Sequence, residues 1–250
     1  MKILGKNYRY LLLVPSLILS QMAHSTPLRV GVEAIPFLPY SEIQADSYQG
    51  VFRDILDLFA KTEGLQFEYV PLPIKRLYSE FYNNTINIKI PANAYWQADT
   101  KAKLKTKIHY SEPLVSFTDG LMVHKSNKHV PIESIKSIGS ISGFTTWEYL
   151  GHIEKGLITK QENPSLLGLL KQGLMRRIDG IYTNIAVAEY YLKNTLKKPG
   201  ELVFAKQLPH TESHFHFATI KNPELIKKFA KFAVTHKADI QKIKAKWQVK

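Results

Sequence analysis

The residues best suited to bind a charged group form a glycine turn in the middle of the chain. The turn comprises Gly143, Phe144, Thr145 and Thr146, and a helix is predicted to begin at about Thr145. The first turn of a helix presents free N–H groups at the positive end of the helix dipole, and a threonine hydroxyl adds another donor. The turn is therefore a candidate site for a carboxylate or phosphate, with simple N-capping by a threonine as the alternative.

Three histidines suggest a metal site. His214 and His216 have the His-x-His spacing that places two imidazoles on one side of a strand, and His210 lies close by. Phe215 and Phe217 alternate with them, which favours a strand with buried phenylalanines and solvated histidines. Because Glu212 is the only acid nearby, we expect no metal. The sequence also contains no phosphate loop, nucleophile elbow or HExxH motif, so we expect no cofactor and no catalytic residue.

The elements that must position these residues begin with a predicted βαβ unit. Residues 28–33 alternate as a strand, residues 50–64 have apolar positions at helical spacing and end in Gly64, and Phe67 and Tyr69 mark a second strand. Ligands of such units lie at the carboxyl end of the first strand. Phe37 and Tyr40 occupy that place.

The rest of the chain predicts two lobes. Two extended segments, 111–123 and 201–218, would cross between the lobes and form a hinge. The insert between them has its own α/β pattern: a strand at 138–142, a strand near 157–159, a helix capped by Asn163, and a strand at 178–182 followed by a helix. In the first lobe, a short helix carries Arg76, and Pro91 is expected to end a strand at 85–90. Helices from Asn222 to Trp247 return to that lobe.

Composition and charge narrow the class of protein. A chain of 250 residues with 44% hydrophobic content can bury a sizeable core. Residues 1–25 combine three basic residues, a short apolar run and an Ala23-His24-Ser25 cleavage pattern, which predicts a cleaved signal peptide. The formal charge is +13, and +10 remains once these three basic residues are removed. The charges are dispersed and no nucleic-acid-binding motif accompanies them, so we expect a solvated basic surface.

Several short motifs in order resemble one known family. They are Gly50-Val51-Phe52-Arg53-Asp54-Ile55 after the first strand, Tyr110-Ser111-Glu112-Pro113, Ile138 to Gly143, Arg177-Ile178-Asp179-Gly180-Ile181, and Ile243 with Lys246-Trp247. The chain resembles the bacterial family 3 extracellular solute-binding proteins. The resemblance implies a two-lobed α/β fold, the type II periplasmic binding protein fold, with mixed sheets, flanking helices and a two-strand hinge. Lobe 1 would comprise residues 26–113 and 212–250, and lobe 2 residues 114–211.

The resemblance also implies a set of ligand-binding residues. Typical members bind the α-carboxylate of an amino acid with an arginine in the loop after the fourth strand, and the α-amino group with an aspartate of the second lobe. This chain has Asn93 and Trp96 in that loop without an arginine, and Asn184 at the aspartate position. Arg76 and Lys89 are the cations that could compensate. An asparagine supplies no negative charge for an ammonium group, so we expect an anionic solute without one.

The resemblance favours a periplasmic, monomeric solute-binding protein that delivers its solute to an ABC-type permease. The solute would be enclosed by Phe37, Tyr40 and Trp96 on one side and by residues 143–146 with Asn184 on the other. Trp147 and Tyr149 are assigned to packing of the second lobe. The alternative is a free-standing periplasmic lyase or dehydratase on the same fold, acting on a small carboxylic acid. Glu33, at the end of the first strand, is the carboxylate that such a reaction would use.

Overall fold

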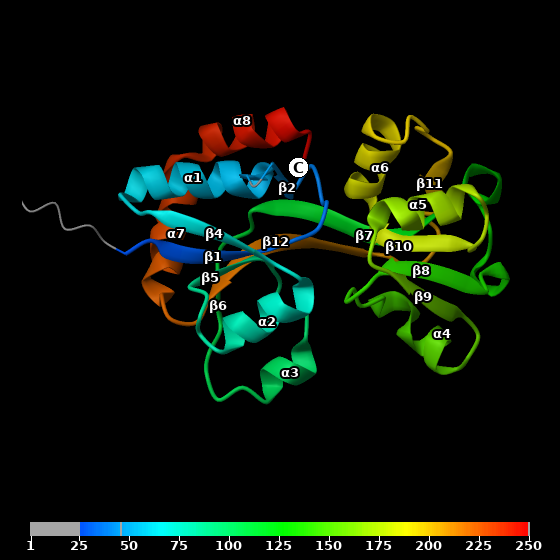
Figure 1. Ribbon diagram of the computed structural model, residues 1–250, viewed down its shortest axis with the longest axis horizontal. Helices are drawn as coiled ribbons and strands as arrows, with labels where there is room; N and C mark the ends of the chain where they lie inside the picture. The colour runs from blue at the N-terminus through cyan, green and yellow to red at the C-terminus, as the bar shows by residue number, and fades with distance from the viewer. Residues whose placement is uncertain (1–25, 46, 250) are drawn as a thin grey trace, which may run out of the picture.

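The computed structural model describes residues 26–45 and 47–249 (Figure 1). The predicted signal peptide lies outside the described residues. The helices and strands gather into two groups, and the long strands β7 (Val115–His124) and β12 (Thr211–Thr219) run between them. These antiparallel strands pair from Thr211 with Asp119 to Phe215 with Val115. They overlap the two segments, 111–123 and 201–218, that were predicted to cross between lobes, and each strand ends one residue beyond its segment.

The first group is built on the predicted βαβ unit. Strand β1 (Leu28–Glu33) leads through a short hairpin, β2 (Glu42–Gln44) and β3 (Ser47–Gln49), to helix α1 (Val51–Glu63) and then to β4 (Phe67–Leu72). Strands β1 and β4 are parallel. The helix ends at Gly64, which has the left-handed conformation expected of a C-cap glycine. Gly50, with a φ of 122°, packs so tightly on the preceding loop that a Cβ would collide with the Tyr40 carbonyl.

The remaining elements of this group are α2 (Ile74–Tyr82), β5 (Ile88–Ala92), α3 (Ala98–Ala102), β6 (His109–Tyr110), α7 (Pro223–Thr235) and α8 (Lys237–Trp247). The prediction that Pro91 ends the strand was wrong, because β5 continues to Ala92. Strand β12 pairs with β5 through a register shift between His216 and Ala218, opposite this part of β5. A proline is tolerated within a strand at such an irregularity because it has no N–H to donate.

The second group contains β8 (Ser137–Ile141), α4 (Leu150–Glu154), β9 (Thr159–Asn163), α5 (Leu166–Leu174), β10 (Gly180–Asn184), α6 (Ile185–Asn194) and β11 (Leu202–Phe204), with 3₁₀ turns at Lys125–Asn127, Ile132–Ser134 and Trp147–Tyr149. Apart from β2 and β3, which form a two-stranded sheet of their own, the strands of both groups form one curled sheet in the order β4-β1-β5-β12-β7-β10-β8-β9, with β6 beside β12 and β11 beside β7. Helices flank both of its faces (Figure 1).

Three local predictions in the second group were wrong. No helix begins at Thr145: a turn and a 3₁₀ helix come first, and α4 starts at Leu150. Two threonines and a tryptophan in succession favour helix weakly, which accounts for the delay. Ser165, not Asn163, caps α5, and its hydroxyl accepts a hydrogen bond from the Gly168 amide. The strand predicted near residues 157–159 begins at Thr159.

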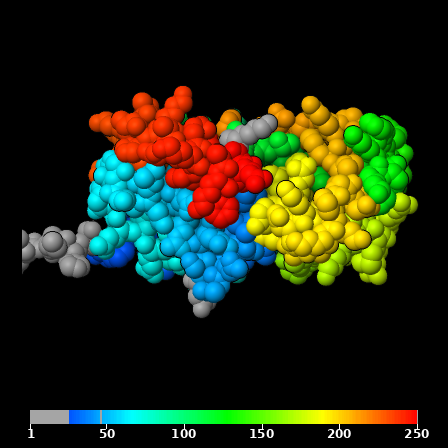
Figure 2. All heavy atoms as spheres, turned by 90° about the horizontal axis from the view of Figure 1, so that it is seen from above, coloured from blue at the N-terminus to red at the C-terminus, as the bar shows by residue number. Residues whose placement is uncertain are grey.

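The two groups of elements are joined by the shared sheet, and they also contact each other through side chains outside it. The Tyr191 hydroxyl on α6 donates a hydrogen bond of 2.8 Å to Glu42 on β2, and it accepts one of 3.4 Å from the Leu38 amide. Figure 2 shows the molecule from above, where blue spheres of the first group meet yellow spheres of the second. The two groups are therefore linked by side chains in addition to the two long strands.

Candidate functional site

A pocket with about 610 Å³ of empty space lies where the two groups of elements face each other. Both groups and both connecting strands supply its lining: Glu33, Phe37, Ile74, Tyr78, Pro91, Trp96, Gln97, Asp119, Gly143, Phe144, Thr145, Trp147, Tyr182 and Phe215. The carboxyl ends of β1, β5 and β10 point to it, as expected for ligand sites of open α/β sheets.

Aromatic rings make up much of the pocket wall. Phe37 and Phe144 meet edge to face across the two groups, with ring centroids 6.1 Å apart. Trp96 packs on Phe215 at 6.0 Å and on Phe117 at 6.1 Å. These contacts hold the Trp96 ring from behind, so that part of the wall is already in place without a ligand.

Two carboxylates lie among these rings. Glu33, at the end of β1, is only 5% exposed, and burial raises the pKa of its carboxyl well above the usual value. Asp119, on β7, accepts a hydrogen bond of 3.0 Å from the Asn184 amide, and burial likewise raises its pKa, to about 7. The neighbouring carboxylates Glu148 and Glu33 raise the pKa of Asp119 further.

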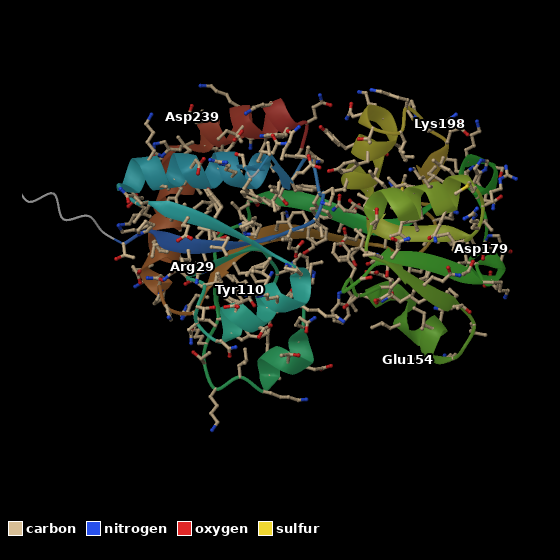
Figure 3. The ribbon with its side chains drawn as sticks, in the orientation of Figure 1. Arg29, Tyr110, Glu154, Asp179, Lys198 and Asp239 are labelled. Atoms are coloured by element: carbon tan, nitrogen blue, oxygen red, sulfur yellow. The ribbon has the colours of Figure 1, made fainter. Side chains whose placement is uncertain are left out.

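Lys89 lies behind the pocket wall. Its ammonium donates to the Pro91 carbonyl and lies 4.3 Å from the centroid of the Tyr78 ring and 5.9 Å from that of Trp96. Burial lowers its pKa, and the charge of Glu33 opposes that shift. Lys89 lines a smaller adjoining cavity with Lys101 and Tyr110, and Figure 3 shows Tyr110 on the side of the sheet where α2 and α3 lie.

The structure brings five of the predicted ligand-binding residues together at the pocket: Phe37, Trp96, Gly143, Phe144 and Thr145. Tyr40, Thr146 and Asn184 lie just outside the lining and are buried. The Tyr40 hydroxyl donates to the Ser116 carbonyl, while Asn184 caps α6 through the Val187 amide and holds Asp119. Asn184 therefore acts on the pocket through Asp119.

The other predicted residues do not line the pocket. Arg76 is largely exposed on α2 and pairs with Glu80 one helical turn away. Asn93 is buried and its amide donates to the Ser213 hydroxyl and the His214 carbonyl, which ties the loop after β5 to β12. Lys89 is separated from the pocket as described above.

The glycine turn differs from the predicted helix start. The Phe144 amide already donates to the Ile141 carbonyl, and the short helix that follows leaves no long helix dipole directed at the pocket. Thr146 provides no side-chain cap, and its hydroxyl has no hydrogen-bond partner among the described residues. What the turn contributes is the ring of Phe144 and the side chain of Thr145.

Several lining residues were missed by the sequence reasoning, chiefly Asp119, Tyr78, Tyr182 and Phe215. Asp119 was detectable as an acid within a segment predicted to be a largely apolar strand. Trp147 was assigned to packing, but it is 41% exposed and lines the pocket, whereas its neighbour Tyr149 is fully buried as expected. The Tyr182 hydroxyl donates to Glu148 at 2.6 Å.

The motif residues outside the pocket have structural roles. Asp179, at the far end of the second group in Figure 3, accepts hydrogen bonds from the Lys136 amide and from the Ser137 amide and hydroxyl. On β12, Phe215 and Phe217 are buried and His214 is exposed, as predicted for the alternating strand. His216 was also expected to be solvated, but it is half-buried, with its Nδ1 2.7 Å from the Ser111 carbonyl oxygen. The described residues contain no group of three or more histidine, cysteine or acidic side chains that could hold a metal. None of their helices is both long and apolar enough to cross a membrane.

Solved structures with the same fold cover most of the chain. The arginine-, lysine-, histidine-binding protein ArtJ from Geobacillus stearothermophilus is 20% identical, with a TM-score of 0.69 over 89% of this chain and 95% of ArtJ. The ancestral amino acid-binding protein AncCDT-1, a precursor of cyclohexadienyl dehydratase, is 21% identical, with a TM-score of 0.68 over 88% and 94% of the two chains. A histidine kinase sensor domain similar to periplasmic binding proteins is 14% identical, with a TM-score of 0.71 over 88% and 95%.

These likenesses establish the fold, which is the type II periplasmic binding protein fold expected from the sequence. A comparison with curated protein sequences gives no match. Residues 28–250 match one family along their whole length. The chain belongs to the bacterial extracellular solute-binding proteins, family 3.

Proposed function

We propose that this chain captures a small solute between two closing lobes and delivers it to an ABC-type membrane permease. Lobe 1 comprises residues 26–113 and 212–250, lobe 2 comprises residues 114–211, and β7 and β12 form the hinge. The observation that supports this most is the position of the pocket. It draws Glu33, Phe37 and Trp96 from lobe 1 and Phe144 and Trp147 from lobe 2.

A pocket divided in this way links binding to lobe closure. A solute that contacts both walls stabilises the closed form by its differential affinity for closed and open states. The permease would then recognise the closed form. We infer that the protein acts as an exported monomer, in keeping with the extracellular family to which it belongs and with the predicted signal peptide.

The sequence predicts an anionic solute, whereas ArtJ is described as binding arginine, lysine and histidine. Amino acids are therefore natural candidates alongside dicarboxylates. The lining, however, contains two carboxylates and no lysine or arginine among the described residues.

The lyase alternative rests on Glu33. A buried carboxyl with a raised pKa inside a pocket can act as a general acid or base near neutral pH. Incubation with small cyclic carboxylic acids, followed by product analysis, separates turnover from simple binding. Turnover that Glu33→Gln abolishes would favour the enzyme.

Binding is tested by thermal unfolding with a panel of amino acids, amines, dicarboxylates and sugar acids, followed by calorimetry on each hit. A solute present at a hundred times its dissociation constant stabilises the protein by about 2.7 kcal/mol. Phe144→Ala removes a ring from the lobe 2 wall and should weaken each hit. Tyr95→Ala is the control, because Tyr95 is 79% exposed next to Trp96 and does not line the pocket. Equal loss of affinity in both variants would place the binding site elsewhere.

A further inference from the structure

We infer that the solute is an organic cation without a carboxylate, such as an amine or guanidine compound, held between Glu33 and Asp119 inside the aromatic lining. This inference rests on the proposed function and adds the charge class of the solute. It departs from the anionic solute predicted by the sequence. Three observations carry it: an unpartnered carboxylate, a second acid on the hinge, and rings that suit a cation.

Glu33 is the first observation. Its side chain lines the pocket at the end of β1 and is 95% buried, since only 5% of the residue is exposed. Among the described residues, no hydrogen bond or ion pair reaches its carboxylate, although buried acids are normally paired. Because this unpaired carboxyl lines the pocket, a bound solute can supply its partner.

Lys89 does not fill that role. It lies on β5, whose residues 88–90 pair with residues 30–32 of β1, so its charge is felt by Glu33. Its ammonium is nevertheless directed to the Pro91 carbonyl and the Tyr78 ring, and it belongs to the adjoining cavity. The positive charge of Lys89 offsets the negative charge of one carboxylate. Three carboxylates, those of Glu33, Asp119 and Glu148, lie in or near the pocket.

Asp119 is the second observation. It lines the pocket from β7, and the only hydrogen bond to its carboxylate among the described residues comes from the neutral Asn184 amide. Glu148 lies close enough to act on it electrostatically, as does Glu33. An anionic solute would add a further negative charge to this group, and like charges at short range repel strongly in a poorly solvated site.

The aromatic lining is the third observation. Phe37, Trp96, Phe144, Trp147 and Phe215 all line the pocket. The negative face of an aromatic ring attracts ammonium and guanidinium groups, most strongly where water is excluded. A standard amino acid could place its ammonium here, but its carboxylate would meet no lysine or arginine in the described lining.

The test compares solutes that share a carbon skeleton and differ in whether they carry an amine, a carboxylate or both. Calorimetry measures the binding of phenethylamine, L-phenylalanine and 3-phenylpropionate, and of agmatine, L-arginine and 4-guanidinobutyrate. In at least one set, the compound without a carboxylate should bind at least about tenfold more tightly than the other two. If neither amine binds more tightly than both of its carboxylate-bearing counterparts, the inference is wrong.

Variants assign the effect to the two acids. Glu33→Gln and Asp119→Asn should each weaken amine binding at least about tenfold, because each removes a carboxylate of the pocket lining that would pair with the cation. Glu68→Gln makes the same change on the neighbouring strand β4 at an exposed residue and should leave affinity unchanged. Thermal unfolding of each variant reports whether it is folded. Folded Glu33→Gln and Asp119→Asn proteins with unchanged amine affinity would overturn the assignment.

The outcomes also separate this inference from the proposed function. If an anion or an amino acid binds and Phe144→Ala weakens it, the pocket is the solute site and only the charge assignment fails. If amines bind but Phe144→Ala has no effect, the pocket assignment itself fails, and both proposals fall with it.

Discussion

The two walls of the pocket are built in different ways. The lobe 1 wall draws on residues far apart in the chain, with Glu33 at a strand end, Phe37 in a loop and Trp96 after another strand. Each is fixed by elements that pack behind it. The lobe 2 wall comes largely from one continuous turn, residues 143–147, whose Trp147 is 41% exposed.

This difference indicates which wall is preformed. Trp96 is held by contacts to Phe117 and Phe215, and Phe37 by contacts to Tyr40 and Phe215. No ring contact was found for Trp147 among the described residues, and the Thr146 hydroxyl beside it has no partner there. We therefore expect lobe 1 to determine the shape of the site and the lobe 2 turn to adjust to the solute.

The largest expected effect comes from exchanging the two tryptophans for alanine. Trp96→Ala removes a half-buried ring from a packed cluster, so it should lower the free energy of unfolding by about 2 kcal/mol and also weaken solute binding about tenfold or more. Trp147→Ala should weaken binding with little loss of stability. Urea unfolding and calorimetry on both variants give the two quantities, and equal loss of stability would remove the distinction between the walls.

The next largest effect is expected from a substitution at Gly143. Its φ is 91°, which disfavours any residue with a Cβ, although the nearest atom to that Cβ, in Ile74, would be 3.8 Å away. Gly143→Ala should therefore lower the free energy of unfolding by about 1–2 kcal/mol, because of the strained backbone conformation and not because of a steric clash. Gly151→Ala, in α4 with open space around it, should instead stabilise by about 0.5–1 kcal/mol. If urea unfolding shows no loss of stability for Gly143→Ala, the turn is not held in this conformation.

Stability should fall as pH rises from about 4.5 to about 7. Burial raises the pKa of Glu33 to about 7 from 4.5, so the native state keeps a proton that the unfolded state has already released. The Lys89 charge opposes the rise in the Glu33 pKa, and the Glu33 charge in turn raises the pKa of Tyr48, Tyr78 and Asp119. Of these groups, Asp119 has its own pKa raised to about 7 by burial, so it contributes in the same pH window and direction.

The Glu33→Gln variant isolates that contribution. Glutamine cannot ionise, so the free energy of unfolding of the variant, measured in urea, should decline less between about pH 4.5 and about pH 7 than that of the parent protein. A bound cation should favour the ionised carboxylate, and affinity should rise with pH where unliganded stability falls. Parallel stability curves for parent and variant would show that Glu33 titrates normally.

The smallest expected effect concerns two buried threonines. The Thr146 hydroxyl has no partner among the described residues, so Thr146→Val should stabilise by about 1 kcal/mol. Thr219, equally buried in lobe 1, accepts a hydrogen bond from the Asn222 amide, and Thr219→Val should destabilise by about 1 kcal/mol. Thermal unfolding compares them, and destabilisation by Thr146→Val would mean that its hydroxyl is satisfied in solution.

The sequence predicted elements whose pattern is local. Helix α1 and its Gly64 cap follow from helical spacing and a terminal glycine, and Phe37 from its place after β1. Asp119 and Phe215 were missed as pocket residues because their strands β7 and β12 are flanked by strands on both sides, and only the pairing register decides which side chains face the pocket. The helix predicted to begin at Thr145 does not form there, because the two threonines and the tryptophan that follow Gly143 and Phe144 are poor helix formers.

The hydrogen bonds of Tyr191 to Glu42 and to the Leu38 amide have a kinetic consequence. Phe37 belongs to the same loop as Leu38, so the segment that carries part of the lobe 1 wall is also tied to α6 of lobe 2. If the two lobes move apart as proposed, these bonds would have to break before a solute enters or leaves. We therefore expect Tyr191→Phe, which removes the hydroxyl that makes both bonds, to speed solute exchange more than it changes contacts to the solute.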